Sequence, residues 1–297
     1  MKKLLFYFGF CLLLGGMGCA PESEISGPMD STSQEDLQAQ IQELRSSPDV
    51  NSLHIEGNRI TDEDLALVRE CPPFEELTLE RCGAISDRGL KNLAGTPLRG
   101  LTLLECGRIT ESGLSEFLET VPQLEGLVIY NCRHITEDIA ATVGKMRGLR
   151  FLVLGFSRYF SHGDVTEHLT ELRDLQSLMI YTDRLPQLQN LRGLENLEQF
   201  YLQGVYKRGN PIRVEDLKPL ESLPLLQEIG FSRCPNLRED ELEAMRQRLP
   251  HCNIHNEPDN FLMFNDRDRR WLVEDHRKDK SRPRMLKDAE EKTPPTQ

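Results

Sequence analysis

Leucines recur along most of this chain at a nearly fixed period. A short L-x-x-L-x-L pattern returns every 22 to 29 residues, and eight such units follow one another. Internal repetition at this period is typical of a solenoid, in which each unit stacks on the unit before it. The aligned positions, taken at the second leucine of the pattern, are Leu53, Leu77, Leu101, Leu127, Leu152, Leu178, Phe200 and Ile229.

Each unit predicts one strand followed by one helix. Alternating runs such as Leu77-Thr78-Leu79 place every second side chain on the same face, as in a strand. A cysteine position follows, and then a hydroxyl residue with an acid after it, as in Ser86-Asp87 and Thr110-Glu111. The hydroxyl predicts a helix N-cap, and the acid is expected to complement the helix dipole. Apolar residues at helical spacing then predict a helix of one to three turns.

The combined pattern, L-x-x-L-x-L-x-x-C-x-x-I-T-[DE]-x-G-L, resembles the cysteine-containing leucine-rich repeat. The segments "FEELTLERCGAISDRGL" and "LRGLTLLECGRITESGL" carry it most fully, and the resemblance covers residues 50–249. It implies an α/β fold: a leucine-rich-repeat solenoid, or horseshoe, of about eight repeats, with a parallel sheet on the concave face and helices on the convex face.

Both ends of a solenoid need a cap. Residues 34–49 predict an N-terminal capping helix, because Leu37, Ile41 and Leu44 lie on one helical stripe behind Ser33 as N-cap. The repeat domain is expected over residues 50–256, with "LPHCNIH" as its closing strand. Residues 257–297 form a tail rich in both charge signs, expected to be partly disordered. Its part from Phe261 to Val273 has the apolar side chains to dock on the domain.

The first residues have the composition of an export signal. Residues 1–18 contain Lys2, Lys3 and an apolar run too short to span a bilayer comfortably, then small residues. The cysteine that follows, Cys19, resembles the lipobox cysteine of bacterial lipoproteins. This implies cleavage before Cys19 and acylation of its thiol, with residues 19–33 as a flexible tether. We expect a cell-envelope location, anchored at the outer membrane and facing the periplasm or the cell surface. An ordinary secreted protein and an uncleaved anchor are the alternatives.

Composition narrows the class of partner. With 38% hydrophobic and 28% charged residues among 297, the chain has material for a sizeable core. Its formal net charge of −12 argues against an electrostatic grip on nucleic acid or on an anionic membrane surface. A protein or peptide ligand is therefore expected, with the membrane contacted through the lipid anchor alone and the protein a monomer.

The recurring cysteines are predicted to be structural. Neighbouring turns lie about 4.8 Å apart, which does not exclude a disulfide by distance, but parallel Cβ directions disfavour one. The sequence contains no C-x-x-C pair of the kind that binds zinc, and the group His251, Cys252 and His255 is at most half of a metal site. We expect no metal and no cofactor, with a disulfide and a metal or redox role as alternatives. The predicted buried thiols are Cys82, Cys106, Cys132 and Cys234.

The residues that alternate with the strand leucines should face the concave surface. The first two units place polar and acidic residues there, whereas units four to seven place an apolar and aromatic strip. Such a strip on a sheet face is typical of a binding patch, unless the C-terminal segment or an insertion in the seventh unit folds over it. The predicted partner-binding residues are Val128, Tyr130, Phe151, Val153, Met179, Tyr181 and Tyr201.

No G-x-S-x-G, phosphate-binding glycine loop or H-E-x-x-H motif occurs, so enzyme activity is not expected. The sequence favours a non-catalytic protein-interaction module of the cell envelope. The alternatives are a cytosolic adaptor similar to F-box-type leucine-rich-repeat proteins, which requires that residues 1–18 are not a signal, and an enzyme of unknown class.

Overall fold

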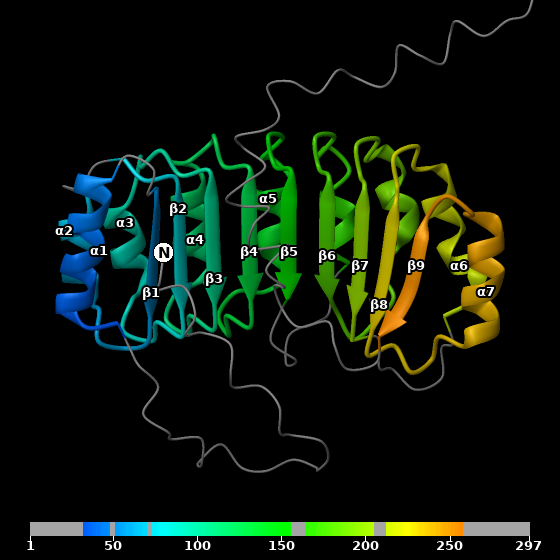
Figure 1. Cartoon of the computed structure of the whole chain (residues 1–297), viewed down its shortest axis with the longest axis horizontal. Helices are drawn as coiled ribbons and strands as arrows, with labels where there is room; N and C mark the ends of the chain where they lie inside the picture. The colour runs from blue at the N-terminus through cyan, green and yellow to red at the C-terminus, as the bar shows by residue number, and fades with distance from the viewer. Residues whose placement is uncertain (1–31, 48–50, 70–72, 156–163, 205–211, 258–297) are drawn as a thin grey trace, which may run out of the picture. The chain divides into compact units, whose positions relative to one another are not determined.

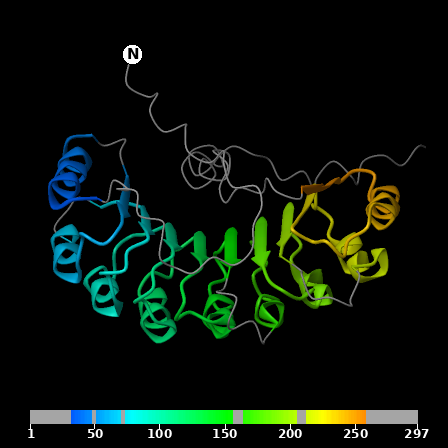
Figure 2. The same ribbon diagram turned by 90° about the horizontal axis from the view of Figure 1, so that it is seen from below.

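The strands of this protein form one parallel sheet in chain order. The computed structural model describes residues 32–47, 51–69, 73–155, 164–204 and 212–257. Within them, nine strands follow one another from β1 to β9 with every neighbouring pair parallel (Figure 1). The helices lie on one side of this sheet (Figure 2). This arrangement confirms the predicted leucine-rich-repeat solenoid. The predicted signal peptide, Cys19 and nearly all of the predicted tail lie outside the described residues.

The register of the sheet is the one that the leucine period predicts. Leu53 pairs with Leu77, Leu77 with Leu101, and so on through Ile229. The strands are β1 (Ser52–Glu56), β2 (Glu76–Glu80), β3 (Gly100–Leu104), β4 (Gly126–Tyr130), β5 (Phe151–Gly155), β6 (Ser177–Tyr181), β7 (Gln199–Gln203), β8 (Glu228–Ser232) and β9 (Asn253–Glu257).

The connecting helices are longest at the two ends of the stack. Their bounds are α1 (Gln34–Ser46), α2 (Asp62–Val68), α3 (Asp87–Asn92), α4 (Glu111–Leu118), η1 (Glu137–Ile139), α5 (Ala140–Val143), η2 (Val165–His168), η3 (Leu188–Gly193), α6 (Val214–Leu217), η4 (Lys218–Ser222) and α7 (Glu239–Arg248). The middle repeats use short 3₁₀ segments, labelled η. None of the helices in the described ranges has the length and apolar character needed to cross a membrane.

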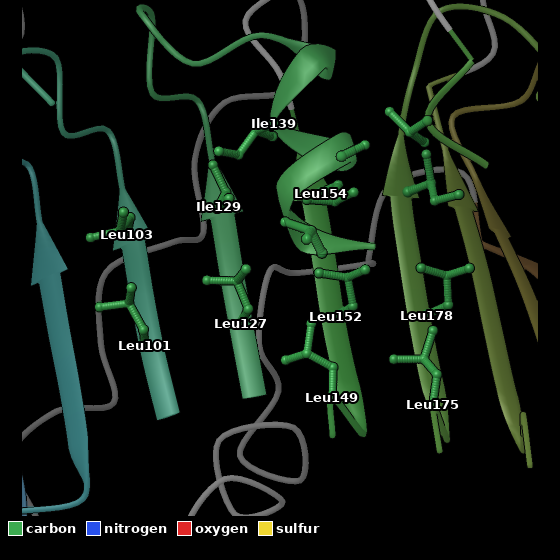
Figure 3. Close-up of a cluster of buried hydrophobic side chains, with 14 of the residues drawn as sticks. Leu101, Leu103, Leu127, Ile129, Ile139, Leu149, Leu152, Leu154, Leu175 and Leu178 are labelled. Atoms are coloured by element: carbon green, nitrogen blue, oxygen red, sulfur yellow. The ribbon is translucent and has the colours of Figure 1, made fainter. Parts of the chain in front are cut away.

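The core lies between the sheet and the helices. Leu101, Leu127, Leu152 and Leu178 occupy one register position on β3 to β6, and all are fully buried (Figure 3). Each repeat buries its leucines against the next repeat, so the core is continuous along the stack. Removal of apolar surface from water is therefore the main stabilising contribution of every repeat.

An acid and a glycine of consecutive repeats fit together on the helical side. The Asp87 carboxylate accepts hydrogen bonds from the Thr110 N–H at 2.7 Å and the Thr110 hydroxyl at 2.8 Å. A Cβ atom on Gly113 would lie 2.0 Å from Asp87 Cγ, so only glycine leaves room for this carboxylate. Asp62, Ser86 and Gly89 repeat the arrangement one unit earlier. The motif [ST]-[DE]-x-G thus describes a contact between repeats, in addition to the helix N-caps observed at Ser86 and Thr110.

The N-terminal edge of the sheet is closed by side chains. Helix α1 begins after Ser33 in a capping box and buries Leu37, Ile41 and Leu44 as predicted, but it ends at Ser46, earlier than the expected residue 49. From α1, the Gln40 amide donates to the His54 carbonyl at 2.8 Å and accepts from the His54 N–H at 3.0 Å. One glutamine therefore pairs with the edge strand β1 as a neighbouring strand would.

Replacing Gln40 with alanine is expected to lower the free energy of unfolding by about 1 kcal/mol and to promote self-association through the edge of β1. Urea denaturation and size-exclusion chromatography measure the two effects. Gln42→Ala is the matched control, since Gln42 is an exposed residue of the same helix. Equal unfolding midpoints and equal elution of the two variants would show that Gln40 does not protect the edge.

At the other end, helix α7 covers the last strand. The Arg246 guanidinium Nε donates to the Ile254 carbonyl of β9 at 3.1 Å, and Ile254 itself is buried. The predicted closing strand is therefore present. It extends to Glu257, so the repeat domain includes one residue more than the predicted boundary at 256.

Candidate binding surface on the concave face

The recurring cysteines point away from the concave face, into the core. The Cys82 and Cys106 thiols each donate to a carbonyl of the preceding repeat at 3.3 Å. Cys132 and Cys234 make the same contact at 3.7 Å. All four, and Cys252, are buried free thiols. These positions are therefore part of the stacking of the repeats.

A left-handed residue turns each of these cysteines inward. Arg81, Glu105, Asn131 and Arg233, each immediately before a cysteine, have φ between 50° and 55°. In two repeats without the cysteine, Gly57 and Gly204 occupy the equivalent position with φ of 85° and 89°. The shared turn places the next side chain under the strand, where the thiol finds its carbonyl.

The environment of Cys82, Cys132 and Cys252 keeps these three thiols protonated. Hydrogen bonding with Cys106, together with burial, raises the pKa of both Cys82 and Cys132. Burial and the nearby charge of Glu228 raise the pKa of Cys252 to about 11. Since thiolate is the reactive and metal-binding form, these three residues are poorly suited to nucleophilic or metal chemistry at neutral pH.

The concave face of β3 to β7 carries a second apolar cluster, separate from the core. It consists of the seven residues singled out in the sequence together with Leu104, and we call it the concave cluster. Six members are buried, and Tyr130 and Tyr181 are partly buried against them. No described helix or strand is packed on this side of the sheet (Figure 2). Its members are Leu104, Val128, Tyr130, Phe151, Val153, Met179, Tyr181 and Tyr201.

Aromatic rings meet over glycines in this face. Tyr130 of β4 and Tyr181 of β6 lie on either side of Gly155, with ring centroids 4.9 Å apart in an edge-to-face arrangement. A Cβ on Gly155 would lie 2.5 Å from the Tyr130 ring, so glycine lets two rings from non-adjacent strands touch. Tyr201 and His255 approach each other over Gly230 in the same way, with centroids 6.4 Å apart. The rings therefore form a fixed surface.

Three further residues shape this surface. Alternation along β5 predicts Gly155 on the concave face, but its contact with rings from the strands on either side cannot be predicted from one repeat. His255 was considered with His251 and Cys252 as half a metal site, whereas its ring belongs to the concave face beside Tyr201. Gln203, at the end of β7, is a buried residue whose side-chain oxygen Oε1 has no hydrogen-bond partner among the described residues. Alternation along β7 predicts Gln203 on the concave face, and alternation along β9 is the signal that would have placed His255 there.

The β1–β2 end of the same face is polar. His54, Glu56 and Glu80 place one potential ligand atom each within 4.8 Å of one another, the one such metal-ligand group among the described residues. Arg81, however, forms ion pairs with both carboxylates, the one to Glu80 at 3.1 Å. Arg81 already pairs with both carboxylates that a metal ion would need as ligands, so we assign no metal to the group. One guanidinium against two carboxylates leaves one net negative charge at this end of the face.

Glu76, beside this group, is expected to make stability depend on pH. Burial, aided by the charge of Glu75 and opposed by Arg99, raises the pKa of Glu76 to about 7 from its ordinary value of 4.5. The folded protein therefore favours protonated Glu76. The contribution of protonated Glu76 to the free energy of unfolding is fully present below pH 4.5 and is lost as the pH rises through 7. Between pH 5 and pH 8 we expect a loss of about 1 kcal/mol, after allowance for solvent screening.

Urea denaturation across this pH range, on wild type and Glu76→Gln, measures the effect. The glutamine variant should lose this part of the pH dependence. Identical pH profiles for the two proteins would contradict the assigned shift.

Comparison with known proteins adds a likeness in structure. No protein-family model and no curated protein matches this chain. A TLR13–ssRNA13 complex is 14% identical with a TM-score of 0.43, and the match covers 77% of this chain but 32% of that chain. The tropomodulin C-terminal domain of Caenorhabditis elegans is 14% identical with a TM-score of 0.23, and the match covers 73% of this chain and 92% of that one.

The yeast Rad7–Elc1 complex is also similar, with 14% identity, a TM-score of 0.26 and coverage of 75% and 88% of the two chains. Likeness at these scores supports no conclusion about activity or partners. The repeat class is visible in the chain itself: parallel strands in sequential order, one register of leucines, and a core between sheet and helices are the features of a leucine-rich-repeat solenoid.

Proposed function

We propose that this protein is a non-catalytic interaction module that binds a protein or peptide through the concave cluster. The observation that carries the proposal is an apolar, aromatic surface on the side of the sheet that no described helix or strand covers. Tyrosines and a methionine in a fixed arrangement are the side chains enriched in protein interfaces. The strand ladder beneath them holds the surface rigid, which lowers the entropy cost of association.

A polar group beside the concave cluster can orient a bound molecule. Gln203 Oε1 is a buried acceptor without a partner among the described residues, and such an atom calls for a donor from a bound molecule. A ligand that offers apolar side chains and backbone N–H groups supplies both requirements. This chemistry is that of a polypeptide.

Affinity capture of partners from the native envelope, with identification by mass spectrometry, tests the proposal. Tyr130→Ala combined with Tyr181→Ala should abolish capture, with thermal unfolding nearly unchanged. Leu225→Ala is the control, since Leu225 lies outside the concave face and is 37% exposed. Capture that survives the double substitution would place the binding surface elsewhere.

We also propose that Cys19 anchors this module in the cell envelope. The support is the signal-like composition of residues 1–18 followed by a cysteine among small residues. Labelling cells with radioactive palmitate should mark the wild-type chain and leave Cys19→Ser unmarked. A wild-type chain that carries no palmitate label and fractionates with the cytosol would contradict the anchor and favour a cytosolic adaptor. Partner capture through the concave cluster would then be tested in a cytosolic extract.

A further inference from the structure

The polarity of the concave face changes in one direction between β7 and β1. The concave cluster occupies β3 to β7, and the β1–β2 end carries Glu56, Glu76 and Glu80 with Arg81. The carboxylates of Glu56 and Glu80 therefore share one guanidinium, and Glu76, whose pKa is raised to about 7, adds a carboxyl group that is partly ionised at neutral pH. Moving from β7 towards β1, the face is first apolar and aromatic and then acidic.

The chain that leaves β9 has the complementary order. After Glu257, the sequence first presents aromatic and aliphatic residues in two groups, Phe261 to Phe264 and Trp271 to Val273. Residues 276–287 follow, with six lysines and arginines against one aspartate. Apolar residues thus come first and basic residues second, which is the order of the apolar and acidic parts of the face on the path from β7 to β1.

The chain is also long enough. Neighbouring strands are about 4.8 Å apart, so β4 lies roughly 24 Å and β1 roughly 38 Å from β9. The 14 residues from 258 to 271 reach up to about 45 Å when extended. Trp271 is therefore within reach of the concave cluster, and residues 276–287 are within reach of the acids on β1 and β2.

We propose that residues 258–287 are an intramolecular occupant of the concave face. The apolar groups around Phe261 and Trp271 cover the concave cluster, and the basic run from Arg277 onward pairs with the carboxylates of β1 and β2. The indole N–H or a backbone N–H of the segment supplies the donor that Gln203 Oε1 lacks among the described residues. The inference rests on the proposed use of this face for binding: the segment competes with a partner, so the partner must displace it.

The chain contains one tryptophan, Trp271, which makes the proposal testable by fluorescence without any partner. In the full chain, we expect Trp271 emission shifted to the blue of free tryptophan amide and protected from acrylamide quenching. Met179→Lys should move the emission to the free value, because it places a charge in the concave cluster. Leu225→Lys, a lysine outside the concave face, should leave it unchanged. Circular dichroism of each variant checks that it is folded.

A Trp271 emission maximum in the wild-type chain equal to that of free tryptophan amide would overturn the proposal. A blue shift that Met179→Lys does not alter would overturn it as well. A blue shift that fades on dilution together with a fall in molecular mass would also overturn it, since the occupant would then be a second copy. None of these outcomes bears on capture of an external partner, so failure of this inference is separable from failure of the proposed function.

Discussion

Replacing Gly113 with alanine is expected to destabilise the repeat domain by about 2–3 kcal/mol, although alanine is the better helix former. The new Cβ would lie 2.0 Å from Asp87 Cγ and displace the carboxylate. The Thr110 N–H and hydroxyl would then lose a charged acceptor at once. Urea denaturation of the two proteins measures the difference.

Two controls isolate the cause. Gly148→Ala should be nearly neutral, because the nearest atom to its added Cβ is a carbonyl oxygen at 4.0 Å. In a protein that already carries Asp87→Gly, which removes the Cβ at 2.4 Å as well as the carboxylate, the effect of Gly113→Ala should change sign and become stabilising by up to about 1 kcal/mol, since the clash is gone and helix propensity remains. Equal destabilisation in both backgrounds would show that the clash with Asp87 is not the reason for the glycine.

Met179→Lys is expected to weaken partner binding at least about 30-fold, the scale of a central interface residue. Met179 is 5% exposed in the middle of the concave cluster, between Val153 of β5 and Tyr201 of β7. A lysine of similar length there brings a charge that a bound apolar side chain would have to desolvate. Binding assays with the captured partner measure the loss.

Thr78→Lys is the matched control for this prediction. Thr78 occupies the same register position on β2, at the polar end of the face. It introduces the same residue with the same charge, and should change affinity by less than about threefold. Equal losses from both lysines would indicate a general electrostatic effect and contradict a specific role of the concave cluster.

The sequence could predict whatever depends on alternation within one repeat. The period of the leucines predicts the register of all neighbouring strands, because a single-residue slip would turn every leucine out of the core. The same alternation predicts that Val128, Val153 and Tyr201 share the concave face, and the structure places them together there. Ser86 and Thr110 are likewise recognisable as N-caps from the acid and apolar residues that follow.

Contacts between repeats were beyond sequence reasoning. The role of Gly113 depends on Asp87, 26 positions earlier, and the role of Gly155 depends on rings from strands to either side. Gln40 resembles any polar residue of a helix until β1 is placed beside it. The middle of the stack also departs from the pattern: η3 begins after Gln187 without a side-chain cap, so the segment winds as a short 3₁₀ helix.

The measurement that most directly tests the binding surface is photo-crosslinking from single positions in living cells. A photoreactive phenylalanine analogue at Tyr181, in the concave cluster, should crosslink a distinct partner, whereas the same analogue at Leu225, exposed outside the concave face, should not. Crosslinks from Leu225 with none from Tyr181 would contradict the assignment of the concave cluster as the site of partner binding.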